Sequence, residues 1–103
     1  MSTKFKSVSK ERIKQKVSPT RYYSREVDLN LSKDYGNSWV IAGLCPYHGD
    51  RKAGSFFVNL QSGAFKCHSC GSKGGDIIAF HQLRYKETFP QALETLSRHW
   101  GVV

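Results

Sequence analysis

The chain is 103 residues long, which is enough for one small domain whose core commonly needs a metal ion, disulfides or a partner for stability. Hydrophobic residues make up 39% of the sequence and charged residues 23%, so wholesale disorder is excluded. The net charge is +8 and no apolar run approaches the ~20 residues that span a bilayer, which argues against a membrane protein and favours an anionic partner.

The positive charge is concentrated at the N-terminus. Eight of the 16 basic residues lie within residues 1–25 beside a single acid, whereas residues 26–103 are almost neutral. A basic segment suits nucleic acid because phosphate contacts release counterions, although a merely solvated tail is the alternative. We expect residues 1–24 to be a basic, flexible arm and residues 25–103 to be the folded domain. The N-terminus lacks the apolar segment of a secretory signal, so we expect a cytoplasmic protein, in which disulfides are rare.

The first half of the folded part has strand periodicity. A short helix is compatible with residues 9–16 and should end before Pro19. Apolar and polar residues alternate over 27–31, and three further runs are rich in β-branched and aromatic residues. Turn residues such as Gly36 and Gly63 bound these runs, which predict strands over 27–31, 39–42, 55–59 and 64–67. The last two runs are close enough in sequence to form a hairpin.

The second half changes to helical periodicity. Asp76 is a good helix cap and precedes apolar residues compatible with a short helix over 77–83. Thr88 and Gln91 fit a capping box, and Gly101 is a stop signal, so a second helix is predicted between them. One face of that helix should be core, with Phe89, Leu93, Leu96 and Trp100.

The strongest chemical signal is a pair of short motifs, Cys45-Pro46-Tyr47-His48 and Cys67-His68-Ser69-Cys70, separated by eighteen residues. Each motif places two soft or borderline ligands two residues apart, and zinc takes four such ligands tetrahedrally. The alternatives are a Cys67–Cys70 redox pair with Cys45 idle, or three buried cysteines; three cysteines cannot pair evenly. His68 could compete as a ligand, but it adjoins Cys67 and should point away, so His48 is preferred.

Four ligands would leave no open position for water, so we expect one structural Zn²⁺ rather than a hydrolytic centre. The predicted fold class is a small α+β zinc-binding domain. It is a zinc ribbon with an antiparallel sheet of about four strands, two short helices after it and the basic arm before it. No set of catalytic residues is visible in the sequence, so the chain by itself is not expected to be an enzyme.

Basic and aromatic residues around the predicted hairpin could bind a polyanion, because bases stack on aromatic rings and cations neutralise phosphates. The candidate DNA contacts are Arg51, Lys52, Phe56, Lys66 and Lys73. Strand aromatics alternate between two faces, so at least half of the ring set Phe56, Phe57 and Phe65 must lie in the core.

Residues 44–103 resemble the N-terminal zinc-binding domain of bacterial and phage DNA primases of the DnaG type. The resemblance lies in the two Cys/His motifs with their flanks, in Lys52-x-x-Ser55-Phe56, and in the segments Gly74–Phe80 and Phe89–Leu96. Residues 25–43 are similar more weakly. The family usually has proline before the Ser-Phe pair, where this chain has Gly54. The N-terminal segment in the family is also shorter and less charged than residues 1–25 of this chain.

The resemblance implies a module that engages single-stranded DNA template during primer synthesis, with catalysis supplied by another chain. The implied partners are a catalytic primase subunit or a replicative helicase. Two other functions stay open from the residues: a zinc-ribbon adaptor that docks on a replication enzyme, and a regulator that binds duplex DNA. The last is disfavoured because no helix carries suitably spaced Arg or Asn for base contacts.

Overall fold

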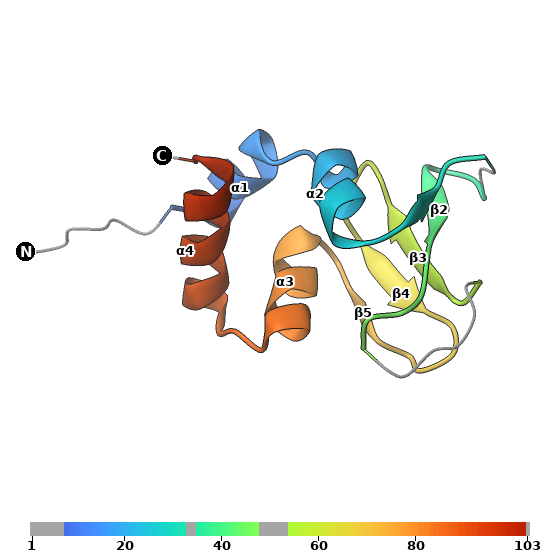
Figure 1. The fold of residues 1–103 in the computed structure, drawn as a ribbon. Helices are drawn as coiled ribbons and strands as arrows, with labels where there is room; N and C mark the ends of the chain where they lie inside the picture. Colours follow the sequence, from blue (N-terminus) through green and yellow to red (C-terminus); the bar gives the residue numbers. More distant parts are fainter. Residues whose placement is uncertain (1–7, 33–34, 48–53, 103) are drawn as a thin grey trace, which may run out of the picture.

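The computed structural model describes residues 8–32, 35–47 and 54–102. Two helices come first, a five-stranded sheet follows, and two helices come last. Figure 1 shows the sheet at one end of the molecule and α4, beside α1, at the other. The elements are α1 (Lys10–Lys16), α2 (Pro19–Glu26), β1 (Leu29–Asn30), β2 (Trp39–Ala42), β3 (Phe56–Asn59), β4 (Phe65–Cys67), β5 (Lys73–Gly74), α3 (Ile77–Tyr85) and α4 (Phe89–Trp100). Within this part of the chain, no helix has the length and apolar character needed to cross a membrane.

The sheet is an antiparallel meander in which the strands follow one another in the order β1-β2-β3-β4-β5. The α+β class and the four predicted strands are confirmed, although β1 is shorter than the predicted 27–31. The fifth strand, β5, was not predicted because its two residues give no periodic signal. It pairs with β4 through Lys66 opposite Lys73 and Phe65 opposite Gly74.

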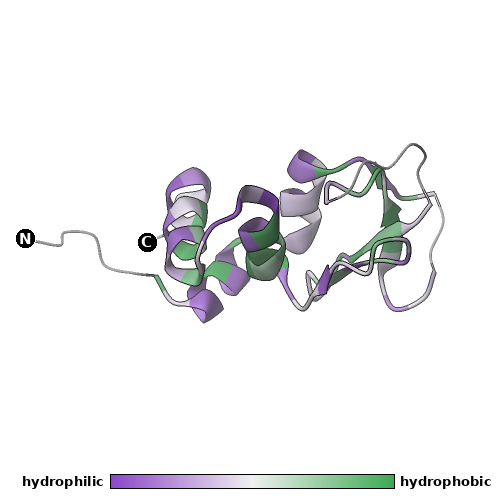
Figure 2. Ribbon diagram, turned by 90° about the horizontal axis from the view of Figure 1, so that it is seen from below, coloured by the Kyte–Doolittle hydropathy of each residue, from purple (hydrophilic) through white to green (hydrophobic). Residues whose placement is uncertain are grey.

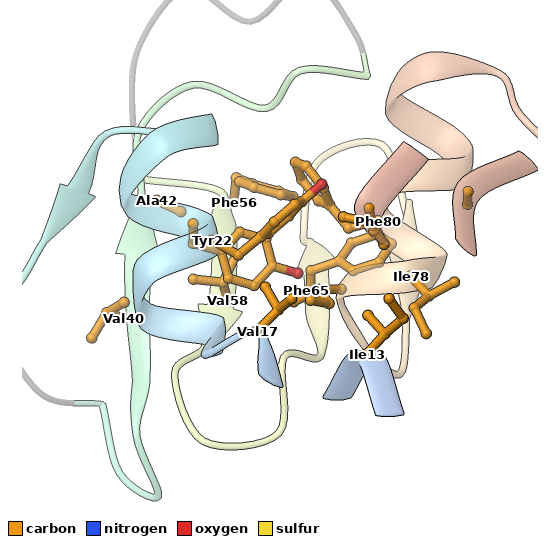
Figure 3. Close-up of a cluster of buried hydrophobic side chains, with 14 of the residues drawn as sticks. Ile13, Val17, Tyr22, Val40, Ala42, Phe56, Val58, Phe65, Ile78 and Phe80 are labelled. Carbon is orange, nitrogen blue, oxygen red and sulfur yellow. The ribbon is translucent and has the colours of Figure 1, made fainter. Parts of the chain in front are cut away.

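One face of the sheet is buried under the helices. Val58, Phe65 and Phe80 have at most 1% exposed surface and lie at the centre of the core. Figure 3 shows Phe65 and Phe80 at the centre, with Tyr22 and Phe56 on one side of them and the helical residues Ile13 and Ile78 on the other. Figure 2, coloured by hydropathy, shows hydrophobic residues along the strands and α3, and both hydrophobic and hydrophilic residues along α4.

Residues 10–26 form two packed helices, α1 and α2, in contrast to the flexible arm expected for residues 1–24. Ser9 and Ser18 cap the two helices, and Pro19 occupies the first turn of α2. The few apolar and aromatic residues of this basic segment are all but fully buried: Ile13, Val17, Tyr22 and Tyr23. The basic composition of this segment does not indicate that it is packed, because its lysines and arginines point outward while these four side chains enter the core.

Both C-terminal helices begin where the sequence predicts, and α4 ends before Gly101 as predicted, whereas α3 continues two residues beyond the predicted 77–83, to Tyr85. Asp76 accepts a hydrogen bond from the Ala79 N–H at 2.8 Å, and Thr88 and Gln91 form the predicted capping box. Leu93 and Leu96 are buried as predicted. Phe89 is 42% exposed, so its predicted place in the core is wrong. It is the first residue of α4, and the buried stripe starts one turn later, at Ala92.

Gly74→Ala is expected to destabilise the fold by about 1–3 kcal/mol, because a methyl group at this position would overpack the core. An added Cβ would lie 2.5 Å from Phe65 Cε1 and 2.8 Å from Ala79 Cβ. Gly75→Ala is the matched control, since a Cβ there meets nothing within 4 Å. Urea unfolding of both variants measures the difference, and equal stabilities would contradict the close packing of β5 against α3.

Candidate metal centre and nucleic-acid interface

The three cysteines occupy two tight turns at the end of the sheet. Cys45 follows β2 after Gly43, whose φ of +64° and close approach to Asp28 favour glycine. Cys67 is the last residue of β4, and its backbone N–H donates to Ser72 O at 2.8 Å, while Gly71 N–H donates to Cys67 O at 2.9 Å. These hydrogen bonds fold the second motif back on itself and bring Cys70 toward Cys67.

The sulfur atoms of Cys45, Cys67 and Cys70 all lie within 4.8 Å of one another. The Cys45 and Cys70 sulfurs are 3.8 Å apart, far beyond the ~2.05 Å of a disulfide. Two thiolates that bind one tetrahedral zinc at ~2.3 Å should be separated by roughly 3.8 Å. The three cysteines are therefore positioned to hold a metal, and the redox-pair alternative that leaves Cys45 idle does not fit this geometry.

The surroundings of the Cys45 and Cys70 sulfurs shift their thiol pKa values in opposite directions. Burial raises the pKa of the Cys45 thiol to about 12, partly offset by the Tyr47 N–H, which donates to its sulfur at 3.4 Å. Hydrogen bonds with the hydroxyl and backbone of Ser72 lower the pKa of exposed Cys70 to about 6. A cation at the centre of the three sulfurs would favour the thiolate form of each, including the buried Cys45.

The predicted fourth ligand, His48, lies outside the described residues. Its neighbour Tyr47 is well defined: the hydroxyl donates to Phe80 O at 2.9 Å, and the ring contacts Phe56 and Phe65. The competing candidate, His68, does not belong to the sulfur cluster. Its ring packs edge-on against Phe57 with centroids 5.2 Å apart, on the other side of the sheet.

The candidate DNA contacts divide into three groups. Lys66 and Lys73 are exposed and paired across β4 and β5. Phe56 has no exposed surface, so the prediction that its ring contacts DNA is wrong. Phe56 on β3 lies opposite Cys67 on β4, and both side chains are on the buried face of the sheet. Arg51 and Lys52 lie outside the described residues.

The sheet face that the helices leave uncovered carries aromatic rings and lysines, and we call it the open face. Phe57 lies opposite Lys66 in the register. The Lys66 ammonium lies 5.1 Å from the centre of the Trp39 ring, a cation–π contact. A shallow depression of about 430 Å³ runs beside them, with Trp39, Lys66 and Lys73 in its lining. Sequence reasoning missed Trp39: alternation on β2 places it on the same face as Ile41 and opposite to Val40, but it does not say which of the two faces is open.

Comparisons with known proteins agree with this geometry. The model of the CHC2 zinc finger family matches residues 6–103. The chain is 43% identical over 60 residues to a DNA primase of Borreliella burgdorferi, and this match covers 58% of the chain and 11% of that protein. It is 34% identical over 92 residues to a DNA primase of Thermotoga maritima, which covers 89% of the chain and 15% of that protein.

A solved structure shows the same fold. The crystal structure of the Aquifex aeolicus primase, with its zinc-binding and RNA polymerase domains, superposes with a TM-score of 0.70 at 26% identity. The match covers 90% of the present chain and 21% of the Aquifex chain. The chain thus spans only a small part of the length of the primases it matches. The sulfur cluster, the fold and these matches together show that the chain is a zinc-binding domain and belongs to the CHC2 zinc finger family of DnaG-type DNA primases.

Proposed function

We propose that the chain is the template-binding module of a DNA primase. One zinc ion, held by Cys45, His48, Cys67 and Cys70, keeps the two turns rigid, and single-stranded DNA lies across the open face. The observation that supports this most is the open face itself, where Trp39 and Phe57 flank the paired lysines. Catalysis comes from a primase polymerase domain in another chain. A replicative helicase is a further partner, and the complex works in the cytoplasm.

The mechanism is one of positioning. A lysine ammonium neutralises a phosphate, and a base stacks on the half-buried ring of Trp39 or Phe57, so a single strand is held without a requirement for a particular base. Lys66 and Lys73 face each other across two strands, at a spacing set by the ladder rather than by flexible loops. The zinc ion supplies no chemistry to primer synthesis here, because four protein ligands would fill its coordination shell.

Trp39→Ala is expected to weaken binding to single-stranded DNA about 5- to 150-fold, because a stacked base contributes ~1–3 kcal/mol. Lys66→Gln with Lys73→Gln should lower the slope of log affinity against log salt by about 1.4, at ~0.7 per phosphate contact. Fluorescence anisotropy on labelled oligonucleotides over a salt series measures both quantities.

Lys10→Gln, on the exposed side of α1, is the matched control for loss of charge away from the sheet. It should change affinity much less than either lysine of the open face. Equal binding to duplex DNA, or unchanged affinity in Trp39→Ala, would contradict template binding. Those results would favour the second hypothesis, a zinc-ribbon adaptor that binds a replication protein.

A further inference from the structure

Each of the two tryptophans of the chain has a basic side chain over its ring, and one of them, Trp39, belongs to the open face. The other, Trp100, is the last residue of α4 and is half-buried. The guanidinium carbon of Arg25 lies 4.8 Å from the centre of the Trp100 ring, and that of Arg21 lies 5.9 Å from it. Both arginines belong to α2, on the side of the sheet that the helices cover, so this arginine pair is separate from the open face (Figure 1).

The Trp100 ring supports both guanidinium groups and leaves their hydrogen-bond donors free. The ring is itself held in place, since its centre lies 6.1 Å from that of the fully buried Tyr22 ring. A guanidinium over an aromatic ring keeps the N–H groups along its edge available. Both arginines are exposed, and within the described part of the chain neither guanidinium has an ion pair or a hydrogen bond. The pair is therefore positioned to bind a group from solvent.

The positions of these two charges are unfavourable for the chain alone. Arg21 and Arg25 lie one turn apart on α2, where like charges repel each other. Arg21 also lies in the first turn, near the positive end of the helix dipole, and that turn contains no acidic residue. Glu26 is adjacent in the sequence, but its carboxylate accepts a hydrogen bond from the Tyr85 hydroxyl at 2.6 Å. An anion bound from outside would relieve the repulsion between the two arginines.

The backbone of a nucleic acid is the anion that fits this pair best. It carries one negative charge on every nucleotide, so neighbouring phosphates can meet both guanidinium groups at once. A guanidinium matches the geometry of a phosphate, with two parallel hydrogen bonds. The surrounding segment attracts the same partner, because residues 8–26 contain six basic residues and two acids.

We propose that Arg21 and Arg25, supported by the Trp100 ring, form a second phosphate-binding site for the DNA strand, on the helical half of the molecule. This second site rests on the proposed function, since the same strand also lies on the open face. It adds affinity and fixes the direction of the strand, and it reads no base, because phosphates carry no sequence information. The molecule is 48 Å along its longest axis. At ~3.4 Å per stacked nucleotide, a strand of roughly 15 nucleotides is as long as the molecule.

The two tryptophan indole groups report the two surfaces separately in one NMR spectrum. The experiment titrates the zinc-loaded, ¹⁵N-labelled chain with a single strand of about 20 thymidine nucleotides, longer than the molecule. We expect saturable shifts of the indole N–H signals of both Trp39, beneath Lys66, and Trp100, beneath the arginine pair.

Arg21→Gln combined with Arg25→Gln should weaken binding of the same strand about tenfold at low salt. It should also lower the slope of log affinity against log salt by about 1.4, at ~0.7 per phosphate contact. Lys10→Gln combined with Arg84→Gln is the matched control. It also removes two exposed charges, and Arg84 likewise lies over an aromatic ring, that of Tyr85. The control should leave the slope nearly unchanged, and thermal melting checks that both double variants are folded.

A Trp100 signal that stays fixed while Trp39 shifts would overturn the second site and leave the open face as the template site. The reverse pattern would support the arginine pair as a DNA site and contradict the function proposed for the open face. Equal losses of affinity in the two double variants would also overturn the proposal, because overall charge would then explain the binding. A last titration compares hexaglutamate with hexathymidylate. Equally tight saturation of the Trp100 signal by hexaglutamate would assign the site to an acidic protein segment instead.

Discussion

Cys67→Ser is expected to remove zinc binding and the stable fold of the sheet end together. Structural zinc contributes roughly 10 kcal/mol or more to small domains, which is comparable to the whole ~5–15 kcal/mol stability of a typical domain. Cys67 is the last residue of β4 and is buried against the core, so its loss affects both the metal and the strand. We expect a stoichiometry near zero by zinc-release assay and the loss of cooperative thermal unfolding.

Ser69→Ala, in the same turn and exposed, is the control and should bind one zinc with unchanged stability. The pair His48→Ala and His68→Ala then identifies the fourth ligand. We expect weakened zinc binding in His48→Ala and full binding in His68→Ala, because the His68 ring lies against Phe57. The reverse result would make His68 the ligand, and retention of zinc by Cys67→Ser would remove the basis for the site.

A chain that begins at Val27 is expected not to fold stably. It lacks α1 and α2, which bury Ile13, Val17, Tyr22 and Tyr23 almost completely. Removal of one such side chain costs about 2–5 kcal/mol, so the loss of four exceeds the usual stability of a domain. The truncation also removes the hydrogen bond from the Tyr23 hydroxyl to Gly63 O, at 2.7 Å. Circular dichroism with thermal melting, at saturating zinc, measures the effect.

Two point variants separate packing from charge in the same segment. Ile13→Ala should cost about 2–5 kcal/mol, and Lys16→Ala, on the exposed side of α1, should change stability by less than about 0.5 kcal/mol. Similar stabilities for these two variants, or a cooperative melt of the truncated chain at the temperature of the full chain, would show that residues 10–26 are not part of the domain.

The metal centre could be predicted from the sequence because zinc ligands obey local spacing rules. A gap of two residues within each motif is enough to specify a turn, and Cys45, Cys67 and Cys70 do come together. The strands β2 to β4 and the caps of α3 and α4 could also be predicted from the sequence, since strand periodicity and capping residues act within a few residues. What depends on short-range geometry was therefore predicted well.

The faces of the sheet could not be predicted in the same way. Alternation shows that Phe56 and Phe57 point to opposite sides, but it does not say which side meets the core. That choice depends on the register, in which Phe56 lies opposite Cys67 and Phe57 opposite Lys66. Register is a long-range property, and the wrong ring was therefore chosen for DNA contact.

Helix α2 was missed for a different reason. Its local signal was present, since Ser18 and Pro19 form a good helix start. The adjacent aromatic pair Tyr22 and Tyr23 does not show helical periodicity, because both side chains are buried at neighbouring positions. They reach different partners: Tyr22 bonds to His81 and Tyr23 to Gly63 O. Only the tertiary structure explains why two consecutive residues both enter the core.

The packing of α1 against α4 determines the order in which the chain can fold during its synthesis. Helix α1 is synthesised before α4 and contacts it, and Ile13 shares a core with Leu96 and Val102. Until α4 has emerged from the ribosome, the apolar side of α1 lacks this contact and stays available to chaperones. Contacts between segments so distant in sequence also slow folding, so completion of this small domain should be a late event, after the ribbon has formed around its metal.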